Sequence, residues 1–390
     1  MRTIPPAFDS IRPYEPEELP AVFDRLLADK QFLAVLAQVF PGTPLDAVTD
    51  TIRKSKTNME FQMNVCYGFL DRLLAAASDG CDMDCGDIDP HGRYTFVSNH
   101  RDIVLDSALL DKLLVDAGFD TTCEIAIGDN LLAAPWIEDL VRVNKSFIVR
   151  RGVGVREMLT ESRRLSEYMH FAIRDKKENI WIAQREGRAK DSDDRTQPSI
   201  LKMMAMGGEG TPAERLAALH IVPVSISYEY DPCDYLKAAE LQLKRDVKGW
   251  KKSSADDVLS MKTGIMGRKG HIHYHLAPCI DDWIREACVQ TDRSAFFDAV
   301  ARHVDEEIHK GYCLYPVNYA AADALAGCDK HADKYTAKQK ADFTEYIESR
   351  IALIDIPGKD DAFLRERLLT MYANPVANQE AARPNDSDKI

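Results

Sequence analysis

The stretch YTFVSNHRDIVLDSALLDKLLVDAG, residues 94–118, decides the fold class of this chain. Its first residues are mostly β-formers and end in the polar pair Ser98-Asn99, which is typical of a buried strand that runs into a turn. Apolar residues then recur at three- and four-residue spacing up to Gly118, which favours a helix closed by a glycine. A strand that passes directly into a helix is the repeating unit of an α/β sheet.

The same alternation continues along the chain. We predict further strands at 123–130, 146–151, 179–187, 220–230 and 269–280, with a helix at about 154–174. Strands that alternate with helices in this way predict a sheet covered by helices.

Helical periodicity dominates on both sides of this region, over residues 17–80 and from about residue 281 onward. The Asp- and Gly-rich segment 78–92 is predicted to be a loop, and the polar end of the chain to be disordered. We therefore predict four parts: an N-terminal helical region (1–88), an α/β core (89–282), a C-terminal helical region (283–375) and a disordered tail (376–390).

The composition is that of a soluble globular protein, with 45% hydrophobic and 29% charged residues. The net charge of −13 argues against nucleic acid as the main partner, because phosphate binding needs a basic face. Nine scattered cysteines indicate reduced thiols rather than a disulfide framework.

No apolar stretch reaches the ~18 residues of a membrane span, and the first residues do not resemble a secretion signal. We therefore expect a cytoplasmic protein whose membrane contact, if it has any, is peripheral.

His100 is the first candidate for chemistry. It follows an apolar strand and precedes a helix, and open α/β sheets place their ligands at that edge. A histidine is a suitable general base for an alcohol when a carboxylate fixes its tautomer, and Asp106 could turn back toward the ring. The alternative is a turn capped by Ser98 or Asn99 in which His100 has no chemical role.

Three later segments of the chain favour a chemical role for His100. In order, VSNHRDIVLD (97–106), FIVRR (147–151), REGRAKD (185–191) and IVPVSISYE (221–229) combine a His–Asp pair, two arginines, a Glu-Gly element and a strand that carries proline. Together they resemble the four blocks of the glycerolipid acyltransferase family, which includes the glycerol-3-phosphate and 1-acylglycerol-3-phosphate acyltransferases. The chain resembles a divergent subgroup of that family.

The resemblance implies a mixed sheet flanked by helices and assigns roles to residues. His100 would be the general base and Asp106 its orienting partner. Arg151, Arg188 and Lys190 would hold the anionic group of the acceptor, because fixed positive charges recognise phosphate and carboxylate. The complete set of implied substrate-binding residues is Asn99, Arg150, Arg151, Glu186, Gly187, Arg188, Lys190 and Pro223.

Two departures from the family pattern leave alternatives open. Five residues separate His100 from Asp106 where the family has four, so Asp102 is a second candidate for the orienting carboxylate. Arg188 follows Gly187 directly, where the family has one residue between Gly and Arg. The role of that arginine could therefore belong to Arg185 or Lys190.

Two other segments carry possible binding chemistry. HIHYH (271–275) places three histidines on one face of a strand, about 6.6–7 Å apart, a spacing that rarely converges on one ion. The expectation is that no metal is bound. LKRDVKGWKK (243–252) is basic with an embedded tryptophan and could contact an anionic membrane surface or be an ordinary solvated helix face.

The expected function is transfer of a fatty acyl group from acyl-CoA or acyl-carrier protein to a hydroxyl of an anionic lipid precursor. The acceptor could be glycerol 3-phosphate, a lysophospholipid or, alternatively, an N-acyl amino acid. No cofactor is expected beyond the acyl thioester as co-substrate, and no oligomeric state is predicted. A metal-dependent hydrolase and a lipid-binding protein without activity are the alternatives from other classes.

Overall fold

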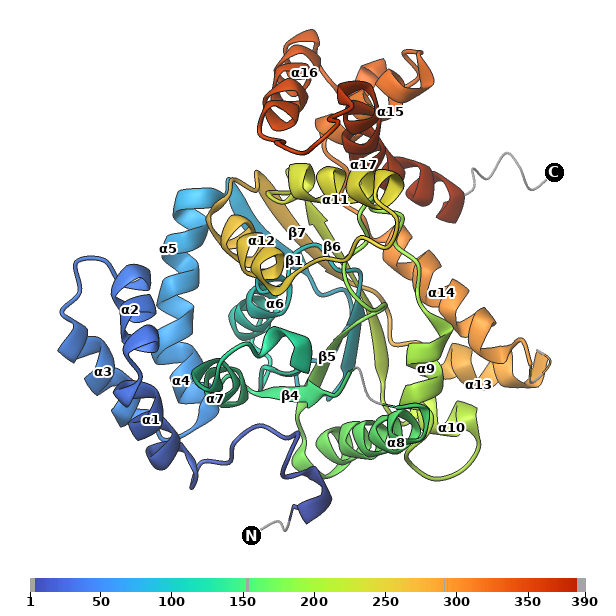
Figure 1. Cartoon of the computed structure of the whole chain (residues 1–390). Helices are drawn as coiled ribbons and strands as arrows, with labels where there is room; N and C mark the ends of the chain where they lie inside the picture. The colour runs from blue at the N-terminus through green and yellow to red at the C-terminus, as the bar shows by residue number, and fades with distance from the viewer. Residues whose placement is uncertain (1–3, 152–153, 291, 293, 384–390) are drawn as a thin grey trace.

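A seven-stranded mixed sheet forms the centre of the protein in the computed structural model, which describes residues 4–151, 154–290, 292 and 294–383 (Figure 1). The strands are β1 (Gly80–Asp84), β2 (Thr95–Ser98), β3 (Cys123–Gly128), β4 (Ser146–Val149), β5 (Asn179–Ala183), β6 (Ile221–Tyr228) and β7 (His271–Leu276). Their order across the sheet is β1-β7-β6-β2-β5-β3-β4.

Five neighbouring strands, β6, β2, β5, β3 and β4, are parallel. β7 pairs antiparallel with β6, and β1 pairs parallel with β7. The parallel part is buried on both faces, which explains why β2, β5 and β6 have continuous runs of buried residues. The predicted α/β class with a mixed sheet and helical cover is confirmed.

The prediction of a loop over residues 78–92, in an N-terminal region without strands, was wrong at β1. Cys81 and Met83 pack against the core, while Asp82 and Asp84 on the other face of the strand are exposed. An edge strand with one solvated face tolerates such acidic residues. Its composition therefore resembles that of a loop.

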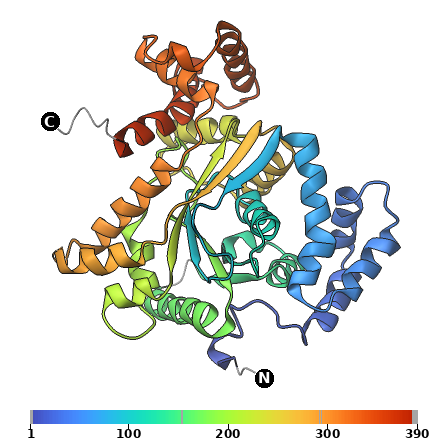
Figure 2. The same cartoon turned by 180° about the vertical axis from the view of Figure 1, so that it is seen from behind.

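Each face of the sheet buries its own set of side chains. On one face, Phe96 and Trp181 pack against α5 (Gly68–Ala77) and α6 (Leu105–Asp116). On the other, Val97 and Ile182 pack in a separate cluster whose helices, seen from behind in Figure 2, are α8 (Val155–Phe171), α9 (Pro198–Met204), α10 (Pro212–Ala217), α13 (Asp281–Gln290) and α14 (Phe296–Lys310). This alternation of neighbouring residues between faces fixes the register of the central strands.

The N-terminal helices form a separate layer. They are α1 (Leu19–Ala28), α2 (Lys30–Val39), α3 (Leu45–Lys54), α4 (Asn58–Phe61) and a π-helical turn (Gln62–Tyr67). Their apolar cluster includes Val143 of α7 (Pro135–Val143), so α7 attaches this layer to the sheet.

The C-terminal helices α15 (Pro316–Ala326), α16 (Ala337–Ala352) and α17 (Asp361–Ala382) pack on α11 (Asp234–Asp246), at the top of Figure 1. A buried polar network supports this contact, because Asp234 accepts from Arg350 at 2.6 Å and from Tyr372 at 2.8 Å. The last helix of the core, α12 (Ser254–Met266), lies between α11 and β7 in the chain.

The predicted disordered tail was wrong for residues 376–382, which belong to α17. Val376 is buried and Asn378 accepts a hydrogen bond from Arg195 at 3.1 Å, so long-range contacts stabilise a polar segment that has no clear periodicity of its own. Residues 384–390 of that prediction lie outside the described residues. No helix in the described part of the chain has the length and apolar character needed to cross a membrane.

Candidate active site

His100 and Asp106 form a hydrogen-bonded pair at the carboxyl edge of the sheet. His100 follows β2, and Asp106 stands in the first turn of α6. The imidazole Nδ1 lies 2.8 Å from Asp106 Oδ2, so a proton on Nδ1 is donated to the carboxylate and Nε2 is left to act as a base. The His100 side chain is 13% exposed and that of Asp106 only 1%. The pair is therefore shielded, with the imidazole still accessible.

Backbone N–H groups hold the Asp106 carboxylate in place. Its Oδ2 also accepts from the N–H of Arg101 at 2.6 Å and of Asp102 at 3.0 Å. These donors come from the turn that separates His100 from Asp106. The turn therefore accommodates the additional residue that distinguishes this chain from the family spacing.

Asp102 has a different role. Its Oδ1 accepts from the N–H groups of Val104 at 2.9 Å and Leu105 at 2.8 Å, which satisfies free donors at the start of α6. Its Oδ2 points at α12, because a Cβ placed on Gly264 would overlap that oxygen. Burial raises the pKa of Asp102, with a further contribution from nearby Asp106. The structure therefore pairs His100 with Asp106.

Gly264→Ala tests the contact between α12 and the turn. The added methyl group must displace the buried Asp102 carboxylate or move α12, and such overpacking typically costs about 1–3 kcal/mol. We expect a lower melting temperature and lower activity. Gly68→Ala is the matched control, because among the described residues its Cβ would meet only Arg72 Nη1, at 3.9 Å. Equal thermal stability of Gly264→Ala and the wild type would contradict the described contact.

Aromatic residues surround the pair. The His100 ring meets Trp181 edge to face at 5.7 Å between centroids, and Trp181 Nε1 donates to Ser98 Oγ at 3.0 Å. The Tyr274 hydroxyl donates to the Asp106 carbonyl oxygen at 2.9 Å. The sequence analysis did not identify Trp181 or Tyr274, because an aromatic residue in a buried strand has no distinguishing local pattern.

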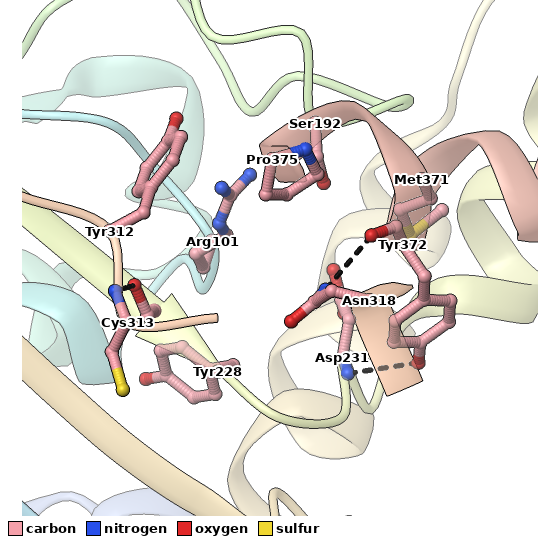
Figure 3. A pocket seen from close by; sticks show the side chains of 11 residues that line it. Arg101, Ser192, Tyr228, Asp231, Tyr312, Cys313, Asn318, Met371, Tyr372 and Pro375 are labelled. Atoms are coloured by element: carbon pink, nitrogen blue, oxygen red, sulfur yellow. Dashed lines mark hydrogen bonds between the residues drawn. The ribbon is translucent and has the colours of Figure 1, made fainter. Parts of the chain in front are cut away.

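Arg101 attaches the turn that carries His100 to the loop after β5. Its guanidinium pairs with buried Asp194 at 2.7 Å, and Tyr312 donates to the same carboxylate at 2.6 Å. Arg101 also lines a cavity of about 30 Å³ between β6 and α17, enough for a water molecule (Figure 3). The loop after β5 and the segment after α14 thus stabilise the turn that carries His100.

Two predicted substrate-binding residues are structural instead. Asn99 is fully buried, and its amide accepts from the N–H of Ile226 at 2.8 Å and donates to the carbonyl of Ile226 at 2.9 Å. Pro223 is buried in the middle of β6, opposite Val97. Neither side chain can reach a ligand in this arrangement, so the predicted contacts are corrected. Asn99 joins β2 to β6 directly beside His100.

Arg151 and Glu186 meet at the mouth of a cavity of about 300 Å³. Arg151 Nη1 lies 3.2 Å from Glu186 Oε1, and the Arg151 N–H donates to Asp129 Oδ1 at 3.1 Å. Arg150 and Arg185 line the same cavity, whose wall includes the apolar residues Ile148, Leu165, Ile200 and Met203. Gly187 forms the adjoining turn with φ +68°, a left-handed conformation that favours glycine. This cavity lies beside the end of β5, the neighbour of β2 in the sheet.

Arg188 and Lys190 lie elsewhere, so the predicted fork of three cations is not assembled. Arg188 is buried and lines a second cavity of about 400 Å³ between α11, α12 and the end of α16. Its Nη1 has no hydrogen-bond partner among the described residues. Lys190 pairs with Glu240 at 3.0 Å, and burial lowers its pKa to about 8. Of the alternatives left open, only Arg185 shares the cavity of Arg151.

The three histidines of β7 are matched to acidic residues of β1. His271 lies 3.1 Å from Asp82, which also pairs with His273, and His275 lies 3.1 Å from Asp84. Within the described ranges these histidines do not gather into a group with metal-ligand spacing. They form a ladder of paired side chains between the parallel strands β1 and β7.

Residues 86–227 match the family model described as Acyltransferase. This segment contains the His100–Asp106 pair, the two arginines that follow β4 and the Glu186 turn, and it ends in β6. This segment of the chain is similar to the acyltransferase family.

The comparison with solved structures finds a likeness to the 1-acyl-sn-glycerophosphate (LPA) acyltransferase PlsC from Thermotoga maritima. The identity is 12%, the alignment covers 75% of this chain and 95% of that chain, and the TM-score is 0.31. No curated protein matches the chain. The assignment as an acyltransferase rests on the family match and on the geometry of the site.

Proposed function

We propose that this acyltransferase moves a fatty acyl group from a thioester of CoA or acyl-carrier protein to a hydroxyl group of an anionic lipid precursor. Glycerol 3-phosphate and lysophospholipids are the acceptor classes that the site fits. The observation that carries the proposal is the shielded His100–Asp106 pair within the segment that matches the acyltransferase family.

His100 acts as the general base in the proposed mechanism. Nε2 takes the proton of the acceptor hydroxyl as its oxygen attacks the thioester carbonyl, and Asp106 stabilises the imidazolium that forms. The tetrahedral intermediate then collapses, the C–S bond breaks, and the imidazolium returns the proton to the departing thiolate. One ester forms and one thioester is consumed, without a covalent enzyme intermediate.

The cavity of Arg151 suits a molecule with an anionic head and an apolar tail. Arg150 and Arg151 are partly exposed at its mouth, where a phosphate or carboxylate can replace Glu186 as the partner of Arg151. The apolar wall behind them can bury hydrocarbon, at roughly 0.8 kcal/mol per methylene group. We therefore assign the acceptor to this cavity.

Arg151→Ala should weaken acceptor binding. A hydrogen bond to a charged group contributes about 1.5–3 kcal/mol, so the KM for the acceptor should rise roughly 10- to 100-fold with little change in kcat. Arg174→Ala is the control, because Arg174 is exposed at the opposite edge of the sheet and its only ion pair among the described residues is with Asp175. An unchanged acceptor KM in Arg151→Ala would remove Arg151 from the acceptor site.

An acceptor and donor panel tests the proposed function itself. Purified protein is incubated with acyl-CoA or acyl-carrier protein and with glycerol 3-phosphate, a lysophospholipid or an N-acyl amino acid, and the products are identified by mass spectrometry. We expect an O-acyl ester of one of the first two acceptors. An ester of only the N-acyl amino acid would establish the alternative acceptor class, and hydrolysis of the donor without any ester would contradict the proposal.

A surface of α11 and α12 is the proposed contact with the membrane on its cytoplasmic side. Trp250 lines the second cavity beside Leu259, and Val247 and Val258 are 47% and 54% exposed. Exposed Lys248 stands within this surface, where a lysine near anionic lipid contributes about 1 kcal/mol. Sedimentation with anionic vesicles should fall roughly fivefold in Lys248→Glu, with neutral vesicles as the control. Equal binding to both vesicle types would contradict a contact with anionic lipid.

A further inference from the structure

Three potential metal ligands meet at the amino edge of the sheet, away from His100. His220 directly precedes β6, and the segment after β7 runs along the same strand end, with the Ile280 N–H donating to the Ile221 carbonyl at 3.0 Å. Cys279 and Asp281 flank Ile280, so their side chains extend on the same side of this segment. The ligand atoms of His220, Cys279 and Asp281 all lie within 4.8 Å of one another.

The donor set and its spacing suit zinc. One imidazole nitrogen, one sulfur and one carboxylate oxygen are ligand types that Zn²⁺ binds, whereas Mg²⁺ and Ca²⁺ prefer oxygen alone. In a tetrahedral zinc site neighbouring ligand atoms are roughly 3.3–3.8 Å apart, as follows from metal–ligand distances of about 2.0–2.3 Å. Small side-chain rotations would bring these three residues to that spacing.

Two further observations point to a ligand at this place. Asp281 Oδ1 is buried without a hydrogen-bond partner among the described residues, although the other oxygen lies 2.6 Å from His220 Nδ1. An unpaired buried carboxylate oxygen is costly unless a cation or water meets it. His220 has φ +50°, a left-handed conformation that is uncommon for a residue other than glycine. Strained positions of this kind are often kept where the side chain has a function.

We propose that His220, Cys279 and Asp281 bind one zinc ion, with water in the fourth position. The ion links the start of β6 to the start of α13 and stabilises that end of the sheet. The site is separate from acyl transfer, because His220 and His100 lie at opposite ends of β2, roughly 16 Å apart along the strand. The sequence analysis missed this site because the histidine is far from the Cys-x-Asp element in the chain.

Titration of tag-free, chelator-treated protein with Co²⁺ and Zn²⁺ tests the proposal. We expect one Co²⁺ per chain, with the visible bands of tetrahedral cobalt and a near-ultraviolet thiolate-to-cobalt charge-transfer band. Zn²⁺ should displace Co²⁺ and raise the melting temperature, because a ligand that binds the native state stabilises it. Substoichiometric binding, or a cobalt spectrum without thiolate, would overturn the proposal.

Matched variants identify the ligands. Cys279→Ser should lose the charge-transfer band, while Cys288→Ser, which changes an exposed thiol on α13, should keep it. His220→Asn retains a residue type that tolerates left-handed backbone, and its Zn²⁺ Kd should rise by at least the roughly 10- to 100-fold that even an outer-shell change costs. The same spectrum in Cys279→Ser and Cys288→Ser would place the metal elsewhere. Folding of each variant is checked by circular dichroism before titration.

Discussion

Replacing His100 with alanine is expected to lower kcat for acyl transfer by about 10²- to 10⁴-fold, the range that a general base contributes. No other base is hydrogen-bonded to Asp106 in the described part of the chain, so the attacking hydroxyl would keep its proton. The measurement is single-turnover transfer at saturating donor and acceptor, which separates chemistry from binding.

The His100→Ala protein should remain folded, because the imidazole is partly exposed and its only hydrogen bond in the described residues is to Asp106. Its melting temperature is therefore measured beside its activity. His91→Ala is the control, since His91 is exposed and pairs with Asp120 at 2.9 Å at the other edge of the sheet. A folded His100→Ala protein with wild-type activity would rule out His100 as the base.

The two carboxylates near His100 should respond very differently to replacement by asparagine. Asp106→Asn removes the charge that stabilises the imidazolium and the acceptor that fixes the Nδ1 proton, so kcat should fall by about 10²- to 10⁴-fold. In Asp102→Asn, the amide oxygen can still accept from the N–H groups of Val104 and Leu105. The loss of activity there should be about fivefold or less, the effect of one modest hydrogen bond.

Measuring kcat for both variants over a range of pH distinguishes a catalytic effect from a structural one. Loss of the Asp106 charge should shift the pH dependence of kcat as well as its height, whereas a damaged fold lowers activity without moving the profile. A larger loss in Asp102→Asn than in Asp106→Asn, in proteins of equal thermal stability, would reverse the assignment made from the hydrogen bonds.

Most of the fold was predicted from local sequence patterns of burial and periodicity. The step from strand to helix around His100 reflects burial and periodicity, which act over a few residues, and it is confirmed in β2 and α6. The edge strand β1 was not predicted, because its solvated face carries acidic residues that are typical of a loop. The helical conformation of the end of α17 was not predicted, because contacts with distant residues such as Arg195 stabilise it.

The sequence predicted which residues lie near the site but not the directions in which their side chains point. The sequence placed Asn99, Arg151 and Arg188 near the carboxyl edge, but side chains from one edge can point in different directions. Asn99 turns inward to β6, Arg151 stands at one cavity and Arg188 is buried at another. Spacing along a chain does not determine in which direction the side chain of a loop residue points, because loop conformation depends on the elements packed around it.

The sequence by itself determined the α/β class, the strand and turn that carry His100, and the order of the blocks that mark an acyltransferase. Periodicity, composition and motif order are properties of neighbouring residues, so they are readable without a structure. Only the tertiary structure decided that Asp106 rather than Asp102 meets His100, and that His220 meets Cys279 and Asp281. Those choices depend on hydrogen bonds and contacts between segments that the fold brings together.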